Sequence, residues 1–331
     1  MIYYLIFLVC AAVIVVSGIK LSKYGDVIAE KTSLGHSLVG ILLISVVTSL
    51  PELISSIGSV TVVDSPSLAF GNVFGSNMFN IFIIFLMDLL FKDDSIFIDV
   101  SLANVITGIY AVLLTFIAMA GFVFKSPQIF WVSSVSVIIF IVYVGSVYSA
   151  YRSSSLDVDV DSKEDEISEI PLSRAVLLFL LFAVLIIVAG LLLSKSADEI
   201  AIRTGLGQSF VGMFLLAAVT SLPEVSAAVG ALRVGSSNMA IGNLFGSCVF
   251  NVAVIFFVDI FYAKGSVFNN VELIHLKSAL FSGIMILIAM IAVKQDKLSK
   301  FRFGRISIYS FYIALFYVFY LYYMYKFRVG V

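Results

Sequence analysis

Residues 34–53, LGHSLVGILLISVVTSLPEL, occur a second time in the chain as residues 206–225, LGQSFVGMFLLAAVTSLPEV. Twelve of the twenty aligned positions are identical, which chance does not produce. A second motif follows each copy, GNVFGSNMFN at residues 71–80 and GNLFGSCVFN at residues 242–251. Because two motifs recur in the same order, the sequence predicts two copies of one structural unit.

The composition is that of a membrane protein. Of the 331 residues, 61% are hydrophobic and 12% are charged, and the mean hydropathy is +1.12, whereas soluble domains carry about 25% charged residues. The 20 basic and 21 acidic residues nearly cancel, which argues against a nucleic-acid partner. Cys10 and Cys248 lie in apolar runs and show neither disulfide nor zinc-ligand spacing. We therefore expect a lipid bilayer as the environment and no cofactor.

The apolar runs predict an all-α membrane protein with ten transmembrane helices. Runs long enough to cross a hydrocarbon core of about 30 Å satisfy their backbone hydrogen bonds internally when they are helical. Each sequence copy holds five runs, and since five is an odd number, the second copy enters the membrane from the opposite side, as an inverted repeat. The predicted spans are 2–19, 36–60, 67–91, 98–122, 128–150, 175–193, 208–231, 238–263, 272–293 and 305–325.

Three parts follow from this plan: a first five-helix repeat at residues 1–150, an acidic linker at 151–173 and a second repeat at 174–331. Thirteen lysines and arginines fall on the linker side of the membrane and seven on the other, so we expect a cytoplasmic linker and extracellular termini in a plasma or inner membrane. The linker begins DVDVD like a calcium-binding loop, but Ser162 and Ser168 stand where such a loop requires glycine and glutamate. We interpret it as a solvated connection.

Two glutamates lie inside predicted spans, at equivalent positions of the two copies. Glu52 and Glu224 each end the sequence Val-Thr-Ser-Leu-Pro-Glu, and a carboxylate inside a spanning helix costs at least about 2.5 kcal/mol, so it indicates a function. Carboxylates that face each other in a poorly screened site stay ionised together when a cation lies between them. Thr48 and Thr220 precede them by four residues, on the same helix face. Such oxygen ligands suit calcium, and the absence of His and Cys from the motif argues against zinc or copper.

The second motif places amides and hydroxyls on one stripe of each following span, at steps of four residues. These groups can ligate sodium, or they can form hydrogen bonds between packed helices, with the neighbouring glycines allowing close approach. For Asn72 and Asn243 the two interpretations are equally supported. For the remaining positions we expect ligation; these are Ser76, Asn80, Ser247 and Asn251.

The paired motifs VVTSLPEL with GNVFGSNMFN and AVTSLPEV with GNLFGSCVFN closely resemble the two alpha repeats of the cation/calcium exchanger superfamily, in its prokaryotic sodium/calcium exchanger branch. The resemblance covers essentially the whole chain. It implies a monomeric antiporter that exchanges several sodium ions for one calcium ion by alternating access, with the first helix of each repeat sliding against the rest. Some members of the superfamily, including potassium-dependent relatives, have an aspartate at the position of Asn251. Because this chain has an asparagine there, potassium dependence is less expected.

The same resemblance implies the ion ligands. Calcium would be held by Glu52 and Glu224, with backbone or hydroxyl oxygens of Thr48 and Thr220. The sodium or central sites would use four serines, two amides and two carbonyls: Ser49, Ser221, Ser76, Ser247, Asn80, Asn251, Ser45 and Ala217.

The sequence also allows alternatives to sodium/calcium antiport. Glutamates in an apolar site can also trade protons for calcium or another divalent cation, although proton-coupled relatives lack the Thr-Ser-Leu-Pro-Glu form. A channel or a cation sensor is a different class, which inverted repeats in a single chain do not favour. An enzyme is not expected, because the sequence shows no nucleophile and base pair.

Four further titratable residues are assigned to the ends of spans. Asp88 and Asp259 are equivalent positions eight residues beyond the central amides, about 12 Å further along a helix, so we expect a helix-end or vestibule role. His36 and His275 lie near predicted span ends, where an interfacial position is expected.

Overall fold

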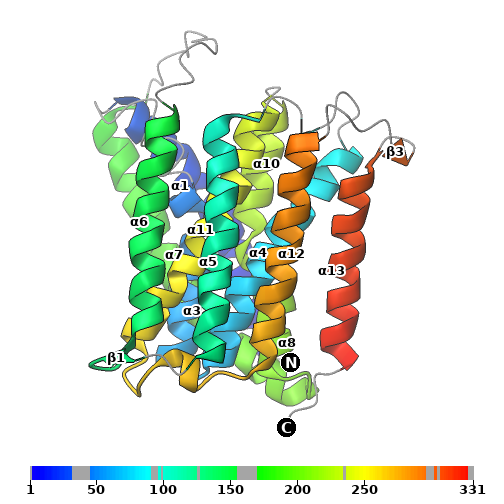
Figure 1. Ribbon diagram of the computed structural model, residues 1–331. Coiled ribbons are helices and arrows are strands. Elements are labelled where there is room, and N and C mark those ends of the chain that lie inside the picture. Colours follow the sequence, from blue (N-terminus) through cyan, green and yellow to red (C-terminus); the bar gives the residue numbers. More distant parts are fainter. Residues whose placement is uncertain are drawn as a thin grey trace.

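The computed structural model describes residues 2–31, 45–90, 96–97, 100–124, 127–154, 170–233, 236–295, 302–303 and 306–326. The chain forms a bundle of long helices that run up and down along one direction, with α1 beginning and α13 ending at the same end of the bundle (Figure 1). The helices are α1 (Ile2–Lys31), α3 (Leu50–Thr61), α4 (Pro66–Leu90), α5 (Leu102–Val123), α6 (Ser134–Ser154), α7 (Leu172–Thr204), α8 (Gln208–Val211), the π-helix η1 (Gly212–Leu216), α9 (Ala217–Thr220), α10 (Leu222–Arg233), α11 (Ser237–Phe261), the 3-10 helix η2 (Val267–Asn269), α12 (Ile274–Gln295) and α13 (Ile308–Lys326).

Two short antiparallel hairpins each precede a helix. The first pairs β1 (Gln128–Ile129) with β2 (Val132–Ser133), directly before α6. The second pairs β3 (Arg302–Phe303) with β4 (Ile306–Ser307), directly before α13. The same local structure therefore recurs before the last helix of each sequence copy.

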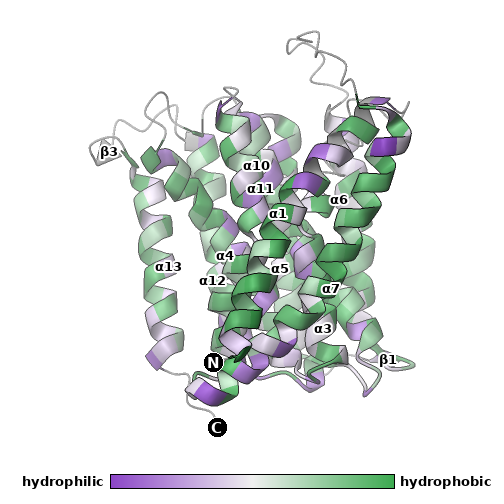
Figure 2. Cartoon of the chain, turned by 180° about the vertical axis from the view of Figure 1, so that it is seen from behind, coloured by the Kyte–Doolittle hydropathy of each residue, from purple (hydrophilic) through white to green (hydrophobic). Residues whose placement is uncertain are grey.

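Eight helices among the described residues are long and apolar enough to cross a membrane: α1, α4, α5, α6, α7, α11, α12 and α13. Hydrophobic residues make up most of these helices, whereas hydrophilic residues gather mainly near the ends of the bundle, with a few at mid-height (Figure 2). This confirms a multi-pass helical membrane protein. Two helices extend further than predicted, since α1 continues to Lys31 and α7 to Thr204.

Two predicted spans contain the glutamates, and neither is a single regular helix. The span predicted at 208–231 is divided into α8, η1, α9 and α10, with a bend of 41° between its two halves. Of the span predicted at 36–60, residues 36–44 lie outside the described residues; a helical turn at 45–48 precedes α3. The break in the span predicted at 208–231 lies just before Pro223, whose ring and missing N–H disfavour a continuous helix.

The centre of the bundle is made by α4 and α11. In the membrane-spanning stretch of each helix, 67% of the residues of α4 and 72% of those of α11 are buried. The corresponding shares are 28% for α1 and 22% for α7. Glycines allow this packing, because a Cβ on Gly75 would overlap the Met213 carbonyl oxygen, and one on Gly246 would overlap the Ser45 hydroxyl. The glycines of the second motif thus serve close helix packing, which was one of the two interpretations of this motif.

The two central helices also touch at equivalent positions of the sequence copies. The Asn77 amide donates a hydrogen bond to the carbonyl oxygen of Cys248 over 3.2 Å, and the Cys248 thiol donates in return to the Asn77 carbonyl oxygen over 3.7 Å. Asn77 and Cys248 occupy the same place in GNVFGSNMFN and GNLFGSCVFN. A contact of this kind arises where two related units meet each other face to face.

Asp88 and Asp259 hold the ends of helices. Near the end of α11, Asp259 accepts the Ser133 N–H over 2.6 Å and the Val267 N–H over 2.7 Å. Near the end of α4, Asp88 accepts the Ser307 N–H over 2.8 Å. Each aspartate therefore binds the hairpin that precedes the last helix of the other copy, which confirms the helix-end role.

Candidate ion-binding site

Each glutamate lies just after a break in its helix. Before Glu52 the break is at Ser49, with φ −91° and ψ 11°, and before Glu224 it is at Ser221, with φ −88° and ψ 8°. Both residues occupy the sparsely populated bridge region of backbone conformations. A proline follows two positions later in each copy, at the start of the next helix, where its missing N–H is tolerated. The same short sequence thus produces the same break twice.

The serines at the two breaks bind the glutamates of the opposite copy. The Ser49 hydroxyl donates a hydrogen bond to Glu224 Oε1 over 2.7 Å, and the Ser221 hydroxyl donates to Glu52 Oε1 over 2.8 Å. All four side chains are fully buried. The arrangement brings the two carboxylates, 172 positions apart in the sequence, into one site.

A second hydroxyl reaches each carboxylate from the central helices. Ser76 of α4 donates to Glu52 Oε1 over 3.4 Å, and Ser247 of α11 donates to Glu224 Oε1 over 3.3 Å. The Ser76 hydroxyl also lies 3.4 Å from that of Thr220. One oxygen of each glutamate is therefore fixed by two hydroxyl groups, one from each half of the chain.

The other carboxylate oxygens have no hydrogen-bond partner within the described part of the chain. These are Glu52 Oε2 and Glu224 Oε2, and the amide atoms of Asn80 and Asn251 share the condition. All four side chains are fully buried. Buried polar atoms are nearly always satisfied, so the unsatisfied oxygens of the two glutamates, which the break serines bring into one site, indicate a ligand that carries positive charge.

Electrostatics supports the same conclusion. The two ion pairs found among the described residues, Arg203 with Glu199 and Lys264 with Asp64, lie outside this site. Buried carboxylates without a basic partner are strongly destabilised unless a cation neutralises them. Two carboxylates surrounded by hydroxyl and amide oxygens form a donor set that suits a hard cation.

The predicted threonine and carbonyl ligands lie at the helix breaks. The Thr48 hydroxyl donates to the Ser45 carbonyl oxygen over 3.3 Å, and the Thr220 hydroxyl donates to that of Ala217 over 3.3 Å. The same two carbonyls also accept the N–H groups of Ser49 and Ser221. The threonine oxygens keep lone pairs for a cation, whereas each carbonyl would have to give up one of its hydrogen bonds to bind one.

The family described as sodium/calcium exchanger protein matches residues 2–149 and 174–326. The chain belongs to this family. The protein is therefore a member of a family of cation/calcium exchangers.

The chain is similar to known proteins both in sequence and in structure. The inner membrane protein YrbG of Escherichia coli K12 is 25% identical over 248 residues, covering 73% of this chain and 74% of YrbG. The H+/Ca2+ exchanger CAX has a TM-score of 0.73 at 14% identity, covering 99% of this chain and 85% of CAX. The sodium-calcium exchanger NCX_Mj has a TM-score of 0.58 at 17% identity, covering 96% of each chain. At these identities the two structures establish the fold alone.

The outer amides of this exchanger-family protein differ between the copies. Asn72 donates to the hydroxyls of Ser55 over 2.9 Å and of Ser56 over 3.0 Å, which supports the packing interpretation. Asn243 has no partner for its amide atoms among the described residues. The sequence contains the reason, because the positions equivalent to Ser55 and Ser56 are Ala227 and Ala228.

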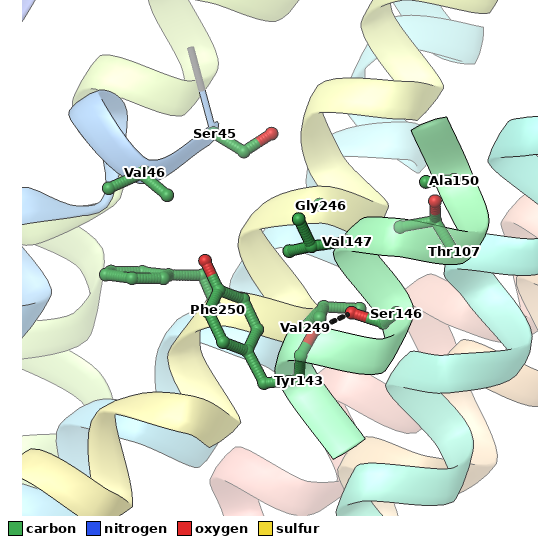
Figure 3. A pocket seen from close by; sticks show the side chains of 10 residues that line it. All are labelled: Ser45, Val46, Thr107, Tyr143, Ser146, Val147, Ala150, Gly246, Val249 and Phe250. Carbon is green, nitrogen blue, oxygen red and sulfur yellow. Dashed lines mark hydrogen bonds between the residues drawn. The ribbon is translucent and has the colours of Figure 1, made fainter. Parts of the chain in front are cut away.

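A small cavity adjoins the site and was not predicted from the sequence. Its volume is about 20 Å³, and its lining includes Ser45, Thr107, Tyr143, Ser146 and Gly246 (Figure 3). A volume of this size holds about one water molecule. The polar groups from α5 and α6 carried no sequence signal, because isolated hydroxyls in apolar helices usually bond to their own backbone.

His275 lies at the start of α12, near a span end as predicted, but its side chain packs inside the bundle. Its side chain is fully buried, and its Nε2 lies 3.0 Å from the hydroxyl of Ser209 in α8. That hydroxyl donates to Glu272 over 2.6 Å. The helix packing at this end of the bundle encloses a residue that the hydropathy pattern places at the interface. His36 lies outside the described residues.

Proposed function

We propose that this exchanger moves sodium ions against calcium, using one site in which Glu52 and Glu224 hold the calcium ion. The observation that carries the proposal is the reciprocal pairing of the glutamates with Ser221 and Ser49, which leaves one buried oxygen of each carboxylate without a partner among the described residues. Two negative charges match one divalent cation, and calcium accepts six to eight oxygen ligands.

Calcium would take its ligands from both halves of the chain. The unpartnered oxygens of Glu52 and Glu224 supply the charge, and hydroxyl or carbonyl oxygens of Thr48 and Thr220 complete the set. Neither histidine nor cysteine is required, in keeping with a hard cation rather than zinc or copper.

Sodium would bind in the same cluster after calcium leaves. Hydroxyls and amides supply oxygen dipoles without further charge, which suits monovalent ions that share two carboxylates. The proposed ligands are Ser49, Ser221, Ser76, Ser247, Asn80 and Asn251, with the carbonyls of Ser45 and Ala217. Competition for the two carboxylates would then couple the opposite movements of the two ions.

We further propose that the chain is an inverted repeat of two five-helix units, residues 1–150 and 174–331, joined by the linker at 151–173. The bent span and the span that contains α3 would raise the number of crossings from eight to ten. The contact between Asn77 and Cys248 supports a two-fold relation.

An offset between the copies supports alternating access. A Cβ on Gly18 of α1 would meet the Pro223 ring, whereas one on the equivalent Gly190 of α7 would meet Ile54, three positions beyond the equivalent proline. Three helical residues correspond to about 4.5 Å. The outer helices thus occupy different positions along the two broken spans, as expected if α1 and α7 slide together to expose the site on either side.

Proton/calcium exchange is the second candidate. Protons can also neutralise two buried carboxylates that have no bonded basic group among the described residues. The amides of Asn80 and Asn251 have no hydrogen-bond partner among the described residues. They favour sodium, because protonation of the carboxylates would leave these amides without a ligand to bind.

Calcium uptake into vesicles that contain the purified protein separates these candidates. An imposed sodium gradient at constant pH should drive uptake of radioactive calcium, and an imposed pH gradient without sodium should not. Uptake driven by the pH gradient alone would reject sodium coupling. Glu199→Gln serves as the matched variant, because Glu199 pairs with Arg203 on the surface of α7. Calcium uptake that requires no counter-ion gradient and is accompanied by single-channel currents would instead indicate a channel.

We also propose that the protein works as a monomer in a plasma or inner membrane, with extracellular termini. The excess of basic residues supports placing the loops after α6 and α12 in the cytoplasm. Single cysteines introduced at Arg174 and at Lys264, in a background without Cys10 and Cys248, test this. Only the cysteine at position 264 should react in intact cells with a thiol reagent that does not cross membranes.

A further inference from the structure

An open apolar groove runs along the outside of the bundle between α5 and α12. The two helices pack side by side (Figure 1), and the groove between them has a volume of about 630 Å³. Its walls include Ile109 of α5 and Leu287 and Ile291 of α12, whose side chains are 55%, 39% and 45% exposed. The groove is thus an apolar surface that faces outward from a membrane helix pair.

One end of the groove carries a positive charge. Lys294 lies in the last turn of α12 and is the one charged residue in the lining; every other described residue of the lining is apolar. From Leu287 to Lys294 the groove extends about 10 Å along the helix axis. The groove is apolar along its length and has a positively charged lysine at one helix end. This arrangement matches a phospholipid, which has apolar acyl chains and, in this case, a negative headgroup.

We propose that this groove binds an anionic phospholipid, with an acyl chain between α5 and α12 and the phosphate at Lys294. The apolar walls receive the chain without any unsatisfied polar group, and the lysine stem lies along apolar surface while its ammonium reaches the headgroup. A basic residue between helices at the membrane boundary attracts anionic headgroups.

Charge in the neighbouring sequence favours an anionic over a neutral lipid. Residues 295–305, QDKLSKFRFGR, contain four basic residues and one acidic residue, so the chain adds positive charge directly after α12. A zwitterionic headgroup gains less from this charge, because its own cation is repelled. The proposal does not depend on which ion is transported, and its test does not measure transport.

Lipid retention by the purified full-length protein tests the proposal. Delipidated protein is mixed with phosphatidylglycerol or phosphatidylcholine, and the bound lipid is counted by native mass spectrometry. We expect about fivefold stronger retention of phosphatidylglycerol, the effect of one lysine near a membrane surface. Lys294→Ala should remove this preference, and Arg174→Ala, an exposed arginine in the first turn of α7, should keep it. Equal retention of both lipids by the unmodified protein, or a preference that survives in Lys294→Ala, overturns the proposal.

A second pair of variants tests the location. Ile109→Trp places a large ring in the groove and should lower retention of both lipids severalfold, whereas Ile138→Trp alters a side chain on α6 that is 46% exposed and should not. A phosphatidylglycerol with a photoreactive acyl chain should label peptides of α5 and α12. Unchanged retention in Ile109→Trp, or labelling confined to other helices, shows that the lipid lies elsewhere and overturns the assignment.

Discussion

The Ser49 hydroxyl donates a hydrogen bond to Glu224 Oε1 over 2.7 Å, and this bond joins the two halves of the chain at a fully buried carboxylate. The equivalent bond from Ser221 to Glu52 measures 2.8 Å. The serine at each helix break thus donates to the glutamate of the other copy, and the glutamate three residues later accepts from the serine of the other copy. The site consequently exists only when both halves are assembled, and a cation held there contacts both.

Replacing either glutamate should abolish calcium binding. Glu52→Gln and Glu224→Gln each remove one of the two negative charges, and breaking a buried charge pairing costs about 3 to 5 kcal/mol, which corresponds to an affinity loss of about 100-fold or more. Calcium titration of the purified variants by calorimetry measures this loss. Glu199→Gln should bind calcium like the unmodified protein, because it alters only a surface pair. Normal calcium affinity in Glu52→Gln contradicts the proposed site.

Removal of the bridging hydroxyls should affect both copies alike. Ser49→Ala and Ser221→Ala each remove a donor that orients the glutamate of the other half, and a hydrogen bond to a charged group contributes about 1.5 to 3 kcal/mol. We expect calcium affinity to fall about tenfold or more in each variant. Thr61→Ala, at the exposed end of α3 where the hydroxyl bonds to its own helix, is the matched control. A large loss in one serine variant and none in the other contradicts a symmetric role.

Much of this arrangement was predictable because the sequence repeats itself. Identical motifs in both copies predict equivalent surroundings for Glu52 and Glu224, and in the structure the predicted serines donate hydrogen bonds to both carboxylates. A proline in each motif indicates a break nearby, but not its location at Ser49 and Ser221, since proline removes one donor without specifying which residue leaves the helix.

Other features depended on contacts between segments distant in sequence. The burial of His275 follows from its contact with Ser209 in another helix, and a local hydropathy pattern contains no information about that partner. The π-helix at Gly212–Leu216 likewise has no counterpart in the residue pattern. The different surroundings of Asn72 and Asn243 could have been predicted by comparing the copies position by position. The two serines that bind Asn72 are replaced by alanines at the equivalent positions of the second copy.

Adding a methyl group to a central glycine should destabilise the protein in proportion to what the group meets. In Gly75→Ala the new Cβ meets backbone atoms of Met213, whereas in Gly246→Ala it meets the Ser45 hydroxyl. Overpacking costs about 1 to 3 kcal/mol, and a side chain yields more easily than backbone. We therefore expect the lower melting temperature for Gly75→Ala.

Gly145→Ala is the control for these glycine variants. Nothing lies within 4 Å of a Cβ at this helical position, and alanine favours helix by about 1 kcal/mol over glycine. The melting temperature should remain the same or rise. A drop in Gly145→Ala as large as that in Gly75→Ala would mean that helix packing is not the cause.

The two aspartates at helix ends should differ in their effect on stability and leave ion binding unchanged. Asp259 accepts hydrogen bonds from two backbone N–H groups and from the Ser136 hydroxyl over 2.6 Å, whereas one such bond is found for Asp88 in the described residues. Since every orphaned buried donor costs about 1 to 3 kcal/mol, Asp259→Ala should lower the melting temperature more than Asp88→Ala. Calcium titration of the folded fraction should give the unmodified affinity for both. An affinity loss in either variant at normal stability would assign that aspartate to the ion path instead of to a helix end.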